Sequence, residues 1–186
     1  MYIDPVCHTG RPSDQRIPQE EAVYDKLEEL GIEFARVDHD HADTMEDCLK
    51  IESILGAKIC KNLFLCNRQK TEFYLLMMPG HKSLRTKELS AQIPTSRLSF
   101  ASGEDMVKYL NVLPGSATVM GLMNDTENHV QLLVDEEILK DEYVGCHPCV
   151  NTSSVKICTE DVFGKFLDAV HHDYITVTLS DNSPQS

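Results

Sequence analysis

The sequence predicts a single α+β domain. Helical periodicities and short apolar segments are mixed along its 186 residues without a regular strand–helix–strand alternation. Most neighbouring strand segments are joined by short turns, which favours hairpins over a doubly wound parallel sheet. With 41% hydrophobic and 25% charged residues, the composition is that of a globular protein, and no repeat or long linker divides the chain.

Three segments are expected along the chain. Residues 1–16 are polar and rich in turn formers, so we expect a flexible N-terminal arm. Residues 17–179 form the domain, and residues 180–186 form a disordered tail. The first 14 residues lack the apolar stretch of a signal peptide, and no apolar run approaches the roughly 20 residues that span a bilayer. We therefore expect a cytoplasmic protein without a membrane partner.

The first elements have clear end signals. A helix is predicted from Pro18 to Leu30, because proline suits a first helical turn, and Gly31 is placed to end it. Residues 32–37 mostly alternate between apolar and polar side chains, which indicates a strand. A second helix is predicted to begin at Thr44, a capping residue, and to stop at Gly56.

The middle of the chain predicts a hairpin followed by short helices. Residues 62–66 and 73–78 are apolar runs on either side of a polar turn, which is the pattern of two paired strands. Short helices are expected over residues 84–91 and 104–110, the second capped by Ser102.

The last third predicts further strands and one amphipathic helix. Residues 117–120, 129–134 and 154–157 read as strands. Thr159 is expected to cap the last helix, and residues 174–179 to form the final strand.

The charge is unevenly distributed. A net charge of −13 argues against a nucleic-acid binder, because phosphate contacts come from lysine and arginine. Residues 58–97, however, contain eight basic side chains and only Glu72 and Glu88 as acidic ones. This basic island favours a small local phosphate contact, such as the end of an RNA. A solvated hairpin and helix with surplus lysines is the alternative.

The segment from Gly145 to Thr152 concentrates functional groups ahead of a predicted strand. Cys146 and Cys149 form a CxxC motif, which in redox proteins opens a helix beside a βαβ unit. With His147 they also offer three zinc ligands, although a structural zinc site needs a second closely spaced pair. Seven cysteines without a secretory signal indicate reduced thiols. We favour a pocket loop without metal or thiol chemistry, and leave redox, zinc and a simple turn open.

Two further pairs of residues could contribute to a site. Lys61 and Asn62 precede an apolar strand, where a lysine could anchor a phosphate, although an isolated lysine is usually a surface residue. Gly115 and Ser116 could expose backbone N–H groups of the kind that stabilise an oxyanion, although a plain turn explains them too. The sequence has no nucleophile elbow and no phosphate-binding P-loop.

The order of several short blocks resembles one known family. The blocks are residues 44–46, 60–65, 98–102, 114–116, 121–125 and 147–152. In this order they resemble the YbaK and prolyl-tRNA-synthetase-associated domain family, in particular its stand-alone prolyl-tRNA editing proteins, over residues 18–179. The Lys-Asn-Leu-Phe-Leu block and the His-Pro-x-x-Asn-Thr block are the most specific.

The resemblance implies a mixed, barrel-like sheet surrounded by helices. It also implies hydrolysis of the ester that joins a wrong amino acid, typically alanine, to the 3′ end of the tRNA for proline, without a cofactor or metal. Aminoacylated tRNA is then a partner, and a prolyl-tRNA synthetase is a candidate partner. A domain of the same fold that binds tRNA or a synthetase without catalysis is the alternative.

The resemblance also implies roles for single residues. The expected catalytic residues are Lys61, Gly145, His147 and Asn151, and the expected substrate-binding residues are Asn62, Gly115, Ser116, Pro148 and Thr152. Lys61 would lie near the phosphate or ribose of the terminal adenosine, and the loop from Gly145 would contact the substrate through its backbone. Water would attack the ester directly, with backbone amides holding the oxyanion. His147 is a candidate general base.

Overall fold

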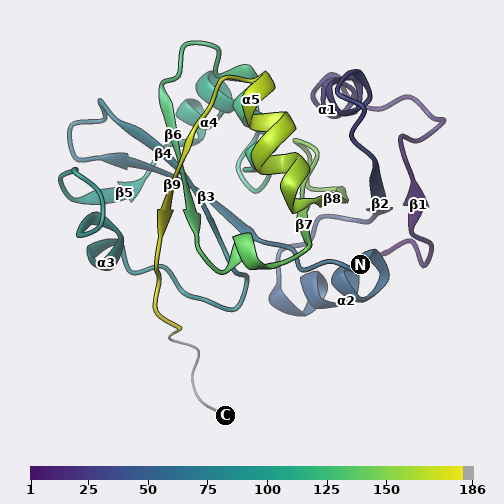
Figure 1. Cartoon of the computed structure of the whole chain (residues 1–186). Coiled ribbons are helices and arrows are strands. Elements are labelled where there is room, and N and C mark those ends of the chain that lie inside the picture. The colour runs from purple at the N-terminus through teal and green to yellow at the C-terminus, as the bar shows by residue number, and fades with distance from the viewer. Residues whose placement is uncertain (182–186) are drawn as a thin grey trace.

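The computed structural model describes residues 1–181, which fold into two sheets with helices packed around them (Figure 1). The strands are β1 (His8–Thr9), β2 (Phe34–Asp38), β3 (Lys61–Asn67), β4 (Phe73–Met78), β5 (Leu98–Phe100), β6 (Val130–Asp135), β7 (Tyr143–Cys146), β8 (Ser153–Cys158) and β9 (Tyr174–Val177). The helices are α1 (Pro18–Glu29), α2 (Met45–Leu55), α3 (Thr86–Ser90), α4 (Gly103–Leu110) and α5 (Leu167–Ala169). Two 3-10 segments, η1 (Val119–Asn124) and η2 (Ile138–Lys140), and a π-helical segment, η3 (Asp161–Phe166), complete the described chain.

The larger sheet has strand order β5-β3-β4-β6-β9 and mixes both strand directions. Its β3 pairs antiparallel with β4 and β5, whereas β4, β6 and β9 run parallel. The smaller sheet, β1-β2-β8-β7, is antiparallel throughout and lies on the other side of the molecule in Figure 1. The predicted α+β class with a mixed sheet is confirmed.

Across residues 1–181, a single bridge joins the two sheets. Ile59, just before β3, pairs with Gly145 in β7 in the parallel sense. The Gly145 N–H donates to the Lys58 carbonyl at 3.0 Å, and the Gly145 carbonyl accepts from the Cys60 N–H at 3.1 Å. A Cβ at position 145 would lie 2.7 Å from the Lys58 carbonyl oxygen, so only glycine permits this approach. The bridge makes the fold barrel-like without closing the sheets into a full barrel.

Local capping chemistry explains where the helices lie. Thr44 accepts a hydrogen bond from the Asp47 N–H at 3.1 Å, and Gly56 ends α2 with a φ of 74°. Ser102 caps α4 in the same way, accepting from the Asp105 N–H at 3.1 Å. The predicted ends of these helices are confirmed.

Several local predictions were wrong. Residues 117–120 do not form a strand; instead Thr118 caps η1, and its hydroxyl donates to the His147 carbonyl at 2.7 Å. The Thr159 hydroxyl donates to the Asp141 carbonyl at 2.6 Å rather than capping a helix. Strands β1, β5 and β7 were not predicted. Each has no more than four residues and depends on pairing with a partner distant in sequence.

The two faces of β3 belong to different parts of the core. Phe64 and Cys66 face the main apolar cluster, which also contains residues of α1, α4 and η3. Leu65, between them, faces a second cluster that includes Leu89 of α3. This alternation follows from the two-residue period of a strand, and it governs which way the first residues of β3 point.

The N-terminal residues contact the domain. Strand β1 pairs with β2, and Arg16 donates to Asp38 at 2.9 Å. Arg11 forms ion pairs with α1, including one to Asp25 at 2.9 Å. The flexibility expected of residues 1–16 stays a prediction, and most of the tail expected at residues 180–186 lies outside the described residues. No helix within residues 1–181 is long and apolar enough to cross a membrane.

Candidate functional site

A cavity of about 490 Å³ opens beside the start of β3. Five of the residues predicted to form a site line it, namely Lys61, Asn62, Gly115, His147 and Asn151. They come from three regions of the sequence, and the fold brings them together at one end of the larger sheet. This cavity is the candidate functional site.

The edge of β3 is uncovered at this point. Strand β5 pairs with β3 only from Leu65 onward, where Leu65 lies opposite Phe100. The Phe64 carbonyl accepts from the Ala101 N–H at 2.9 Å, and beyond it residues 61–63 of β3 have no strand on that side. The cavity therefore reaches residues from both faces of β3.

Lys61 and Asn62 are directed to opposite faces of this strand by its alternation. Asn62 is in step with Phe64 and faces the main core, whereas Lys61 is in step with Leu63 and Leu65. The Lys61 ammonium donates to the Lys82 carbonyl at 2.6 Å, which fixes its side chain along the turn after β4. A cationic group and a neutral amide thus lie on different sides of the cavity.

Asn62 carries an unsatisfied acceptor. Its Nδ2 donates weakly to the Cys60 carbonyl at 3.4 Å and to the Cys60 Sγ at 3.5 Å. Because the carbonyl can only accept, the amide nitrogen must be on that side, and Oδ1 is directed elsewhere. Within residues 1–181, Oδ1 of Asn62 is the one buried side-chain nitrogen or oxygen without a hydrogen-bond partner.

His147 is held as a neutral ring. Its Nδ1 lies 2.9 Å from the Ser153 carbonyl, which can only accept, so Nδ1 carries the proton. Burial lowers the pKa of His147 to about 4, and the nearby rings of His39 and His41 act in the same direction. Near pH 7 the Nε2 atom is therefore unprotonated and acts as a hydrogen-bond acceptor.

The Asn151 side chain connects two segments of the cavity wall by hydrogen bonds. Its Oδ1 accepts from the Ala42 N–H at 3.3 Å, and its Nδ2 lies 3.5 Å from the Ala42 carbonyl. The loop before α2 is thereby fixed against the loop after β7. Gly115 closes the wall, since a Cβ at that position would lie 3.7 Å from the Asn151 amide nitrogen.

The other four predicted residues do not line the cavity. Gly145 uses both its backbone N–H and its carbonyl in the bridge between the sheets. Ser116 and Pro148 are buried, and the Ser116 N–H donates to the Leu113 carbonyl at 3.0 Å. Thr152, in the turn before β8, lines a separate depression next to Arg16.

The thiols of the CxxC motif are buried. Cys146 and Cys149 are 1% and 3% exposed. Burial raises the pKa of Cys149 to about 12, and raises that of Cys146 further, so neither supplies a thiolate near neutral pH. In the described part of the chain, no group of three or more His, Cys, Asp or Glu is placed to hold a metal ion. This geometry supports neither redox chemistry nor zinc binding at the motif.

Some cavity residues were not predicted. Phe100 of β5 lines the cavity and is 64% exposed, and Met45 and Leu49 of α2 also line it. Phe100 belongs to one of the blocks that carry the family resemblance, which was the available signal. The exposure of an aromatic side chain depends on where β5 ends and cannot be read from local pattern.

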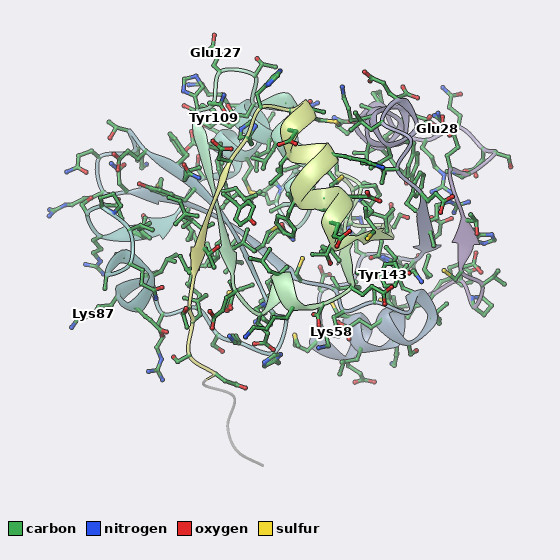
Figure 2. All side chains as sticks on the ribbon, viewed as in Figure 1. Glu28, Lys58, Lys87, Tyr109, Glu127 and Tyr143 are labelled. Carbon is green, nitrogen blue, oxygen red and sulfur yellow. The ribbon has the colours of Figure 1, made fainter. Side chains whose placement is uncertain are left out.

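A smaller cavity of about 210 Å³ adjoins this one beneath α2. It is mostly apolar and shares Met45, Leu49 and Ile59 with the larger cavity. Its charged residues include Lys58, which is paired with Asp141 at 3.6 Å. Lys58 and Tyr143, both labelled in Figure 2, line this smaller cavity. We take the larger cavity as the site, because the neutral imidazole and the unpartnered amide both belong to it.

The basic island is not one surface. Lys82 is buried, and its ammonium contacts Asp135 at 2.9 Å, Glu137 at 3.0 Å and the Leu179 carbonyl at 2.8 Å. Lys58 and Lys87 lie far apart, on different sides of the molecule (Figure 2). Lys61 is the basic residue of the island that lines the larger cavity.

Comparison with known proteins agrees with this picture. The model of the aminoacyl-tRNA editing domain family matches residues 39–164. The protein named prolyl-tRNA editing protein ProX, from Acetoanaerobium sticklandii, is 32% identical over 142 residues, which cover 76% of this chain and 87% of that protein. Prolyl-tRNA synthetase associated domain-containing protein 1 of Mus musculus is 30% identical over 159 residues, covering 83% of this chain and 92% of that protein.

The fold is also found among solved structures. A structure provisionally described as a trans-editing enzyme for prolyl tRNA synthetase superimposes with a TM-score of 0.66 at 14% identity. The match covers 89% of this chain and all of that one. The family match includes every residue found in the larger cavity, from Ala42 to Asn151. The chain belongs to the aminoacyl-tRNA editing domain family.

Proposed function

We propose that this protein is a trans-editing deacylase, which hydrolyses the ester of a mischarged tRNA, with alanine on the tRNA for proline as its substrate. The observation that carries the proposal is the cavity at the open edge of β3. It combines a lysine on one face of the strand with neutral polar groups on the other. The names of the ProX and mouse relatives, and the family itself, support a tRNA substrate.

The two sides of the cavity suit the two ends of the substrate. Lys61 supplies a point charge for the phosphate or ribose of the terminal adenosine. The exposed ring of Phe100 at the same cavity offers an apolar face on which a base can stack. Opposite them, Asn62, Ala101, Met106 and His147 form a partly apolar chamber for the aminoacyl group.

The backbone of β3 offers an oxyanion donor. Because the Phe64 carbonyl points toward β5, the N–H of Asn62, two residues earlier, points the same way, beyond the end of β5. A donor there would stabilise the charge that develops when water attacks the ester, and such donors contribute about 3–4 kcal/mol in other acyl-transfer enzymes. The Gly145 N–H, which donates to Lys58, is not assigned this role.

His147 is proposed as an orienting acceptor rather than as a strong base. A ring whose pKa is about 4 removes a proton from water poorly, since general bases work best with a pKa near the ambient pH. Its unprotonated Nε2 accepts a hydrogen bond from the substrate or from the attacking water. A hydroxyl of the terminal ribose then positions the water, and no covalent intermediate forms.

We propose that selection for alanine rests on the size of the chamber. A synthetase pocket shaped for proline rejects alanine weakly, because each missing methylene is worth only about 1–3 kcal/mol. A second chamber that admits alanine and excludes the proline ring supplies the remaining discrimination. Partnership with a prolyl-tRNA synthetase would shorten the path between the two sites, and it stays a proposal.

The test is deacylation of the tRNA for proline charged with alanine, beside the same tRNA charged with proline. The proposal predicts rapid loss of alanine while proline is spared. If the folded protein binds both RNAs and hydrolyses neither, it is a binding module of the same fold. Hydrolysis of a different charged pair would keep the deacylase and correct its substrate.

A further inference from the structure

Within residues 1–181, two acceptor atoms of the cavity receive no hydrogen bond from the protein. The Asn62 Oδ1 atom is buried without a partner, and the His147 Nε2 atom is the unprotonated nitrogen of a ring whose other nitrogen is bound to Ser153. A buried acceptor without a hydrogen-bond partner destabilises the protein, and such atoms in native structures usually meet a ligand or an ordered water. Both residues line the same cavity. A ligand group that satisfies both acceptor atoms must therefore donate hydrogen bonds.

A chain of hydrogen bonds fixes the orientation of Asn62. The Asn62 amide nitrogen donates to Cys60 Sγ at 3.5 Å, and the Cys60 thiol donates to the Gly145 carbonyl at 3.3 Å. Burial raises the pKa of the Cys60 thiol to about 12, so it keeps its proton and its donor role. Rotating the amide would place Oδ1 against the Cys60 carbonyl, oxygen to oxygen. The Asn62 amide therefore directs its acceptor, Oδ1, away from Cys60 and its donor, Nδ2, toward it.

We infer that these two acceptors bind the protonated α-amino group of the aminoacyl ester, through Asn62 Oδ1 and His147 Nε2. An ammonium has three N–H donors and no acceptor, which suits two acceptor atoms. Lys61, the cation that lines the cavity, is directed to the other face of β3 and does not oppose it. The inference rests on the proposed deacylase function and deepens it, because it names the group on the substrate that is recognised.

The inference defines a substrate class. Esters with a free α-ammonium satisfy both acceptors, whereas an N-acylated or N-formylated aminoacyl group replaces the cation with a neutral amide. The protein would then spare peptidyl-tRNA and N-formylated initiator tRNA, whatever their side chain. Exclusion of proline remains a matter of ring size, because the prolyl ammonium still has two N–H donors.

Glu52 provides the competing explanation. It also lines the cavity and could bind an ammonium through its charge. Its Oε1 accepts from the Ile59 N–H at 2.8 Å, a contact that a glutamine oxygen can replace. Glu52→Gln therefore removes this charge while keeping the local structure, and Asp43→Asn removes the charge of the other carboxylate that lines the cavity. The two variants together separate the two explanations.

The test compares alanyl-tRNA with lactyl-tRNA, made from it by deamination, so that a hydroxyl replaces the ammonium at almost the same size. Each enzymatic rate is divided by the spontaneous hydrolysis rate of the same ester, because the two esters differ in intrinsic reactivity. We expect the enhancement for the alanyl ester to be about 10-fold or more above that for the lactyl ester. Asn62→Ala should reduce this ratio by about 10-fold, while Glu52→Gln leaves it unchanged.

A matched control is available in the same strand. Asn67 is a buried amide of β3 whose partners are Thr71 and Glu72 in the turn, and it does not line the cavity. Asn67→Ala should lower stability without changing the alanyl-to-lactyl ratio. Equal enhancement of both esters by the unmodified protein would overturn the inference and leave the deacylase standing. Loss of the alanyl-to-lactyl ratio in Glu52→Gln would also overturn it. So would an Asn62→Ala variant in which the rates for the alanyl and the lactyl ester fall equally. No hydrolysis of either ester would overturn the proposed function and the inference together.

Discussion

Lys61 and Asn62 are adjacent in β3, yet their side chains are directed to opposite faces of the strand at the mouth of one cavity. The Lys61 ammonium is anchored on the Lys82 carbonyl, and the Asn62 amide on Cys60. The proposed site for an anion, at Lys61, and the proposed site for a hydrogen donor, at Asn62, therefore lie on opposite faces of one strand. The proposed binding of a phosphate and of an aminoacyl group depends on that separation.

Lys61→Ala should weaken binding of the RNA end more than it slows the chemical step. We expect KM to rise by about 10-fold, since a hydrogen bond to a charged group contributes about 1.5–3 kcal/mol, and the rate deficit should shrink at high RNA concentration. Lys87→Ala, on the remote helix α3, is the matched control and should leave KM unchanged (Figure 2). An unaltered rate for Lys61→Ala at limiting RNA would refute the phosphate role.

The low pKa of His147 should appear in the pH dependence of stability. The folded pKa of about 4 lies below the ordinary 6.5, so the folded state binds fewer protons than the unfolded state between these values. This contribution is fully present above pH 6.5 and is lost as the pH falls toward 4, by at most about 3 kcal/mol.

The measurement for His147 is urea unfolding of the unmodified protein and of His147→Asn, whose amide nitrogen can still donate to Ser153. The difference in unfolding free energy between the two proteins should decrease as the pH falls from 6.5 to 4. A difference that is independent of pH would show that the ring is not buried in its neutral form.

Cys146 and Cys149 should be dispensable for hydrolysis. Replacing both by alanine should cost some stability through lost packing, but deacylation by the folded variant should stay within a few-fold of the original rate. In the unmodified protein, exposed Cys7 should react quickly with a thiol reagent, while both CxxC thiols react only on unfolding. Loss of activity in a folded variant would revive a thiol or metal role.

Lys82→Met should destabilise the fold strongly. The substitution leaves Asp135, which is fully buried, without its cation, and breaking such a pair typically costs about 3–5 kcal/mol. Lys87→Met, at an exposed position, should change the unfolding free energy by less than about 0.5 kcal/mol. Similar values for both variants in chemical denaturation would mean that Lys82 is a surface lysine after all.

Much of the fold could be predicted because its signals are local. Thr44 and Gly56 define the ends of α2 through side-chain and backbone chemistry that a short window contains. The segment after Gly115 misled the prediction, since its β-forming residues are drawn into η1 by the contact between Thr118 and the His147 carbonyl. That contact joins positions 29 residues apart and leaves no trace in the local pattern.

The candidate site, too, could be predicted only where the signal is local to a motif. Lys61, His147 and Asn151 were identified by their motifs, and the cavity brings them together. Gly145 was assigned to the site by its place in a motif, but its N–H and carbonyl join the two sheets instead. Thr152 follows Asn151 directly, and only the path of the backbone reveals that it lines a different depression.

The most direct test of the central claim is to obstruct the cavity without disturbing the fold. Ala101 lines it at the edge of β3, whereas Ala91 is exposed at the end of α3 and does not line it. Single-turnover hydrolysis of alanine from the tRNA for proline should fall by about 100-fold in Ala101→Phe and stay unchanged in Ala91→Phe, with both variants folded. A folded Ala101→Phe that retains the full rate would show that the ester is cleaved elsewhere.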